Sequence, residues 1–188
     1  MMERQGSPRA EAIFAGLGGQ GVLLAGLLLA ESAVSEYVNV VWTPSYATRV
    51  RGGPCECTVI LSQEEICSPL LSRAQAVVLM QPLQLASFEG RLRPHGLLVV
   101  EAAGLGDRRV TRPEVRLLVV PGQEVALKLG DRMAANLVLL GAYVAATGAL
   151  SPGPIEEELA RRFGHKPEVL ALNREAFRRG LEVGRASP

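Results

Sequence analysis

Residues 12–30 of the chain read AIFAGLGGQGVLLAGLLLA, which is a short apolar run, then a cluster of glycines, then a long apolar segment. Residues 12–15 predict a buried strand, because the apolar run ends at a glycine and shows no helical spacing of polar residues. From Val22 onward the apolar pattern is helical. The order of strand, glycine turn and helix predicts the first unit of an α/β domain.

The glycines of this turn have the spacing G-x-G-x-x-G. With that spacing the first glycine permits a tight turn, the second admits a phosphate or another backbone, and the third lets the helix lie on the sheet. A helix that begins at Val22 also points free N–H groups and the positive end of its dipole at the turn, which favours an anion. An equally good interpretation is that the loop binds no ligand and only connects the strand to the helix. The candidate binding residues are Gly16, Gly18, Gly19, Gln20 and Gly21.

NAD binding is disfavoured, because an NAD site of this type needs an acidic residue at the end of the second strand. The second predicted strand, residues 38–43, reads VNVVWT and ends without an acidic residue.

The two histidines, His95 and His165, each stand beside proline or glycine in a loop. A solvated side chain is the more common role there than a general base, so we assign no catalytic residue.

The length and composition of the chain predict a single domain. Its 188 residues are 48% hydrophobic, enough for a single sizeable core. A net charge of +1 without a run of basic residues argues against nucleic acid as a partner. Residues 1–10 predict a disordered lead-in without the apolar region of a signal peptide, which favours a cytoplasmic protein. We expect one domain at residues 11–184 and a short tail at 185–188.

Two further segments need an interpretation. Residues 133–150 are uncharged over roughly the length of a membrane span, but they contain Asn136 and Tyr143, and a central helix of an α/β domain has the same composition. Cys55 and Cys57 have the wrong spacing for a redox motif. They could share one strand face and bind a soft metal with a third ligand, although small buried residues are the more common interpretation. We predict no metal site.

A second candidate loop, residues 44–54, reads PSYATRVRGGP. Arg49 and Arg51 stand beside paired glycines in a turn bounded by prolines. Such a loop can present guanidinium groups to a phosphate or a carboxylate, although a solvated turn would have the same composition.

Together the two loops resemble the gamma subunit of the 2-oxoacid:ferredoxin oxidoreductases, which oxidise pyruvate, 2-oxoglutarate, branched-chain 2-oxoacids or indolepyruvate. That family usually has glycine and an acidic residue between Pro-Ser-Tyr and Arg-Gly-Gly. Ala47 replaces the glycine here, and the acidic position is not filled. The resemblance covers about residues 12–184. Further positions that match the family are Ile66, Ser68 and Pro69, then Asn136 and Gly141, then Lys166, Asn173, Ala176, Phe177 and Gly180.

The resemblance implies a subunit of an enzyme that converts a 2-oxoacid, coenzyme A and oxidised ferredoxin into acyl-CoA, carbon dioxide and reduced ferredoxin. Thiamine diphosphate, Mg²⁺ and a [4Fe–4S] cluster are then expected on partner subunits, because this chain has neither a Gly-Asp-Gly motif with a downstream Asn nor four clustered cysteines. The chain itself would be a non-catalytic scaffold near the coenzyme A path. Its glycine turn, Arg49 and Arg51 would contact coenzyme A or another subunit, and ferredoxin would bind through the complex.

For the fold we predict a Rossmann-like three-layer sandwich, with a largely parallel sheet, helices on both faces and a helical C-terminal third. The alternating strand after Arg51 leaves open an antiparallel edge. The alternative function is a self-contained Rossmann-type nucleotide-binding protein. An acidic residue after the second strand or a catalytic His or Lys in a cleft would favour that alternative, and neither is apparent.

Overall fold

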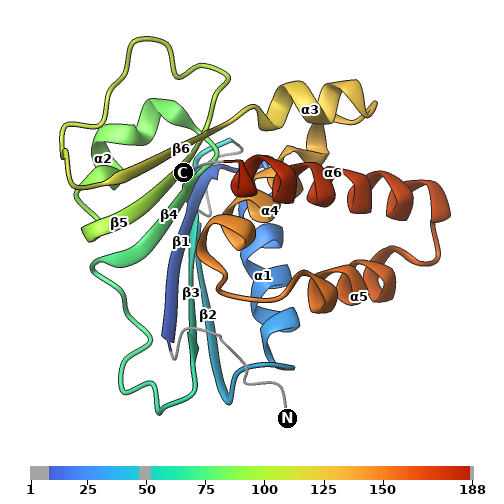
Figure 1. Cartoon of the computed structure of the whole chain (residues 1–188), viewed down its shortest axis with the longest axis horizontal. Helices are drawn as coiled ribbons and strands as arrows, with labels where there is room; N and C mark the ends of the chain where they lie inside the picture. The colour runs from blue at the N-terminus through green and yellow to red at the C-terminus, as the bar shows by residue number, and fades with distance from the viewer. Residues whose placement is uncertain (1–8, 47–51, 187–188) are drawn as a thin grey trace.

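The computed structural model describes residues 9–46 and 52–186. Within these residues six strands form one sheet, which runs through the middle of the molecule with most helices on one side (Figure 1). The strand order is β2-β3-β1-β4-β5-β6. The strands are β1 (Arg9–Leu17), β2 (Asn39–Tyr46), β3 (Pro54–Ser62), β4 (Ala74–Leu79), β5 (Leu92–Glu101) and β6 (Arg116–Val120).

Strands β1, β4, β5 and β6 run parallel, whereas β3 runs antiparallel to both of its neighbours, β1 and β2. Consecutive strands can pair in parallel only through a crossover of about a dozen residues or more. The short connection at residues 47–53 leaves β2 and β3 the antiparallel pairing. The antiparallel strand that the sequence left open therefore exists, but it lies inside the sheet, with β2 at the edge.

The first strand begins earlier than the domain boundary predicted at residue 11. Arg9 and Ala10 pair with Ser62 and Leu61 of β3, and Ala10 is buried. These two residues therefore belong to the sheet and not to a lead-in. Residues 1–8 lie outside the described part of the chain.

The helices confirm the predicted α/β fold, with a mostly parallel sheet and a helical C-terminal third. Figure 1 shows α2 on one face of the sheet and α1, α3, α4, α5 and α6 on the other. The three-layer arrangement is thus uneven, and its second outer layer is thin. The helices are α1 (Val22–Ala33), α2 (Leu85–Glu89), α3 (Gly122–Lys128), α4 (Ala135–Thr147), α5 (Pro152–Phe163) and α6 (Pro167–Arg185), with short 3₁₀ turns η1 (Pro82–Gln84) and η2 (Arg132–Ala134).

Helix α4 is the central helix of the thick helical layer. Residues 136–144 are all buried, because the sheet and α6 pack around them. This position explains the uncharged segment at residues 133–150 without a membrane. Within the described ranges, no helix is both long enough and apolar enough to span a bilayer.

Glycines bring the backbones of α4 and α6 into direct contact. A Cβ atom added at Gly180 would overlap the carbonyl oxygen of Val138, and one added at Gly184 would overlap that of Ala142. In the other direction, a Cβ at Gly141 would overlap the carbonyl oxygen of Phe177. Since a backbone carbonyl cannot rotate away as a flexible side chain can, the depth of α4 in the molecule depends on these glycines.

Substitution of Gly180 tests this contact. G180A should lower the free energy of unfolding by about 1–3 kcal/mol, because the methyl group must push two helices apart. Urea unfolding of the purified chain measures the loss. The matched control is G153A in α5, where an added Cβ meets no atom within 4 Å, and its stability should stay within about 1 kcal/mol of wild type. Equal effects of the two substitutions would show that the helices do not depend on the contact.

Candidate functional site

The predicted turn joins β1 to α1 at the carboxyl edge of the sheet. The glycine turn is defined here as residues 18–21; β1 ends at Leu17 and α1 begins at Val22. Gly19 and Gly21 have φ angles of 97° and 75°, in the left-handed region that favours glycine. Gly21 is also the N-cap of α1, and no side chain caps this helix end. Among the described residues, no side chain therefore caps the first N–H groups of α1, which leaves them available to a ligand.

Gln20 ties the turn to two strands. Its Oε1 accepts a hydrogen bond from the N–H of Leu17 at 2.7 Å, and its Nε2 donates to the carbonyl of Met80 at 3.3 Å. Gly16 lies in β1, where an added Cβ would stand only 2.6 Å from that Oε1. The first glycine of the motif therefore makes room for the side chain of Gln20, a different role from the tight turn expected of it.

The second glycine of the motif meets another backbone. The N–H of Gly18 donates to the carbonyl of Gly53 at 2.9 Å. An added Cβ at Gly18 would stand at ordinary contact distance, 3.5 Å, from the nitrogen of Gly52. This hydrogen bond joins the glycine turn to the end of the second candidate loop. Arg49 and Arg51 lie outside the described residues.

The third glycine of the motif, Gly21, leaves room for a side chain of α4, a helix much later in the chain. A Cβ added at Gly21 would overlap the side-chain amide of Asn136 in α4, so Gly21 does not serve the contact between helix and sheet that the motif implies. That contact is made at Gly26, where an added Cβ would overlap the Sγ of Cys57 in β3.

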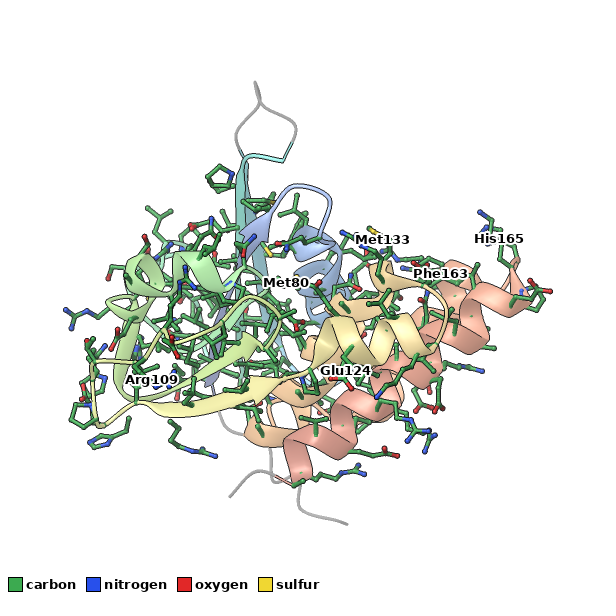
Figure 2. The ribbon with its side chains drawn as sticks, turned by 90° about the horizontal axis from the view of Figure 1, so that it is seen from above. Met80, Arg109, Glu124, Met133, Phe163 and His165 are labelled. Atoms are coloured by element: carbon green, nitrogen blue, oxygen red, sulfur yellow. The ribbon has the colours of Figure 1, made fainter. Side chains whose placement is uncertain are left out.

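A small cavity opens beside the glycine turn, at the carboxyl ends of β1, β4 and β5. Its volume is about 60 Å³, whereas pockets that enclose a drug-sized ligand span roughly 300–1,000 Å³. The cavity can hold a few water molecules but not a nucleotide. Figure 2 labels two of its lining residues, Met80 and Met133. The full lining is Gly19, Gln20, Met80, Glu101, Gln123, Arg132, Met133, Ala135, Asn136 and Leu139.

Glu101 is a buried carboxylate in this cavity that the sequence analysis did not select. It ends β5 and is 2% exposed. Its Oε1 accepts from the N–H of Ala103 at 2.9 Å, and its Oε2 accepts from the N–H of Gln123 in the first turn of α3 at 3.0 Å. Burial raises the pKa of Glu101, and the backbone N–H groups partly oppose that rise. An acidic residue at the end of an apolar strand was the signal available in the sequence.

The histidines and cysteines stay away from the cavity. His95 and His165 are exposed, and Figure 2 shows His165 at the outer end of the α5–α6 pair. Cys57 is fully buried, and burial raises the pKa of its thiol to about 12, so it packs as a neutral side chain. In the described part of the chain no group of three or more His, Cys, Asp or Glu residues is placed to hold a metal ion.

Comparisons with known proteins give consistent findings. The protein-family model described as "Pyruvate ferredoxin/flavodoxin oxidoreductase" matches residues 11–183. The 2-oxoglutarate synthase subunit KorC of Archaeoglobus fulgidus is 32% identical over 172 residues, which cover 91% of this chain and 86% of KorC. A solved structure, the keto/oxoacid ferredoxin oxidoreductase gamma subunit of Geobacter sulfurreducens, is similar with a TM-score of 0.80 at 28% identity, covering 95% of this chain and 99% of that one.

Another relative is considerably longer. The ketoisovalerate oxidoreductase subunit VorA of Methanothermobacter thermautotrophicus is 32% identical over 180 residues, covering 95% of this chain but 37% of VorA. The chain thus spans little more than a third of that relative's length.

Replacement of Glu101 should change how stability depends on pH. An unfolded glutamate titrates at about pH 4.3, and folded Glu101 keeps its proton to a higher pH. Between the two pKa values the native state binds more protons, so stability falls as pH rises. As pH rises above the unfolded pKa of about 4.3, wild type should therefore lose stability relative to E101Q, measured by urea unfolding from acidic to neutral pH.

The matched control for this pH dependence is E124Q in α3. The pKa of exposed Glu124 is lowered by its hydrogen bond to Lys128. Wild type should therefore gain stability relative to E124Q as pH rises through the acidic range. The same sign of pH dependence for E101Q and E124Q would contradict the assignment to Glu101.

Proposed function

Because the chain belongs to the pyruvate ferredoxin/flavodoxin oxidoreductase family, we propose that it is the gamma-type subunit of a 2-oxoacid:ferredoxin oxidoreductase. The observation that carries the proposal is the similarity, along nearly the whole described sequence, to subunits of this kind. The chain and KorC cover 91% and 86% of each other, and the chain and the Geobacter gamma subunit cover 95% and 99%. The assembled enzyme would oxidise a 2-oxoacid in the presence of coenzyme A and pass the electrons to ferredoxin.

The residues of this chain do not fit the redox cofactors of such an enzyme. A [4Fe–4S] cluster needs four thiolate ligands, and the sequence has three cysteines. Of these, Cys57 is a buried neutral thiol, and Cys67 lies exposed on a different segment. The cluster therefore belongs, in this proposal, to a partner subunit. Thiamine diphosphate and Mg²⁺ are assigned to partner subunits as well, because the sequence has no Gly-Asp-Gly motif. The gamma-type chain would contribute no catalytic residue.

What the chain contributes is an edge of the coenzyme A path. The start of α1 presents free N–H groups and a positive dipole end, which favour a phosphate. The hydrogen bond from Gly18 to Gly53 brings the described end of the second candidate loop to the same edge, and we propose that Arg49 and Arg51 act there. Since a cavity of about 60 Å³ cannot enclose a coenzyme, the coenzyme would lie along this edge against a neighbouring subunit. The cavity size equally disfavours the alternative of a self-contained nucleotide-binding protein.

Assembly is the direct test of the proposal. Co-expression with the thiamine-diphosphate and ferredoxin-type subunits should give a complex that elutes as one species on gel filtration and reduces ferredoxin or a viologen with a 2-oxoacid. The purified chain alone should have no such activity. Decarboxylation of a 2-oxoacid by the chain on its own would overturn the assignment of chemistry to partner subunits.

Arg51 tests the coenzyme A edge within the assembled enzyme. Loss of one charge-assisted contact costs about 1.5–3 kcal/mol, so R51A should raise KM for coenzyme A roughly 10- to 100-fold. Decarboxylation without coenzyme A should not change. R49A tests the neighbouring arginine in the same way. R109A is the matched control, because Arg109 is exposed and donates to carbonyls of its own loop, Gly106 and Arg108.

The competing role for Arg51 is an ion pair with a carboxylate of another subunit. In that case R51A would weaken assembly and lower every activity together. A complex that dissociates on gel filtration while KM for coenzyme A stays unchanged would assign Arg51 to the interface.

A further inference from the structure

Asn136 connects the central helix to the glycine turn. It lies in the first turn of α4, is 3% exposed, and donates from Nδ2 to the carbonyl of Gly21 at 3.2 Å. The bond to Gly21 is therefore the polar contact that a substitution of Asn136 would remove.

The carbonyl of Gly21 is also the first acceptor of α1. The N–H of Ala25 donates to it at 3.0 Å, so the oxygen receives one bond from its own helix and one from α4. A trans peptide is planar, with its C=O and N–H pointing in opposite directions. Two donors on the carbonyl therefore fix the direction of the N–H of Val22, the first of the free N–H groups at the start of α1.

Two other polar side chains that line the cavity, those of Gln20 and Glu101, form hydrogen bonds with other parts of its backbone. Gln20 fixes the strand end of the turn through Leu17 and Met80. Glu101 holds the start of α3 through Gln123. Asn136 contacts the helix end of the turn, and the close approach is possible because Gly21 has no Cβ.

We propose that Asn136 is a positioning residue: through the carbonyl of Gly21 it directs the free N–H groups at the start of α1 and so sets the affinity of the glycine turn for its anionic ligand. This inference rests on the proposed function, in which that ligand is a phosphate of coenzyme A. Asn136 touches no reacting atom, so the effect falls on binding of coenzyme A and not on the thiamine-dependent step.

N136D in the assembled enzyme is the first test. The substitution keeps the shape of the side chain, but an ionised carboxylate cannot donate to Gly21 and repels its carbonyl oxygen. KM for coenzyme A should rise about 10-fold, the effect of one lost hydrogen bond on the direction of the Val22 N–H. Decarboxylation in the absence of coenzyme A and the elution volume of the complex should stay unchanged. N136L, which also lacks the donor, should raise KM similarly at neutral pH.

Lowering the pH separates positioning from a general structural role. Burial raises the pKa of a carboxyl group, so the N136D carboxyl should regain a proton, and with it a donor, in mildly acidic solution. The KM ratio between N136D and wild type should then fall toward one, while the ratio for N136L stays high. The charged groups that line the same cavity are Glu101 of β5 and Arg132 of η2. Both are present in all three proteins, so N136L reports their effect on the KM ratio without a second carboxyl group in the cavity.

Hydrogen exchange provides a readout besides activity. In the wild-type complex, coenzyme A should slow exchange in the peptide that covers residues 18–25, and N136D should weaken that protection without faster exchange in α6. If coenzyme A leaves this peptide unprotected in wild type, the proposed function is wrong and the inference falls with it. If wild type is protected but N136D keeps the wild-type KM, the inference alone is wrong. Faster exchange throughout N136D, with loss of every activity, would also overturn the positioning role.

Discussion

The contact between the backbones of α4 and α6 is the constraint on which the candidate site depends. Gly180 and Gly184 let α6 lie directly on α4, and this depth places the first turn of α4 against the glycine turn. Asn136 can then reach the carbonyl of Gly21, a residue 115 positions earlier in the chain. A packing requirement at the C-terminal end of the sequence thus determines the geometry of a loop near its beginning.

The sequence predicted the parts of the fold that depend on local patterns. Residues 12–15 lie in β1 and Val22 begins α1, because apolar runs and glycine breaks act over neighbouring residues. Other features depend on distant partners. The position of β3 between β2 and β1 and the contact of Asn136 with Gly21 have no local spacing that reveals them. The motif glycines show the same limit: their positions were evident, but Gly16 makes room for Gln20 and Gly21 for Asn136, and neither role follows from G-x-G-x-x-G.

The size of the cavity decides what kind of site the carboxyl edge can form. A volume of about 60 Å³ excludes an enclosed cofactor, yet the free N–H groups of α1 still favour an anion at the surface. Such an edge binds weakly by itself, because solvent screens an exposed charge. A second subunit that covers the edge would exclude water and strengthen the same contacts. The shape of the site therefore agrees with the proposed dependence on partner subunits.

The polar side chains at this edge form hydrogen bonds with the backbone, as expected of side chains that have a structural role. Hydrogen bonds to main-chain N–H or carbonyl groups are formed by Gln20, Asn136 and Glu101. Burial raises the pKa of Glu101, but each of its oxygens already accepts a backbone N–H and so holds the start of α3 or of the β5–β6 loop. A general base must reach its substrate before its pKa matters. The arrangement therefore supports the proposed role, in which the chain positions a coenzyme for chemistry performed by another subunit.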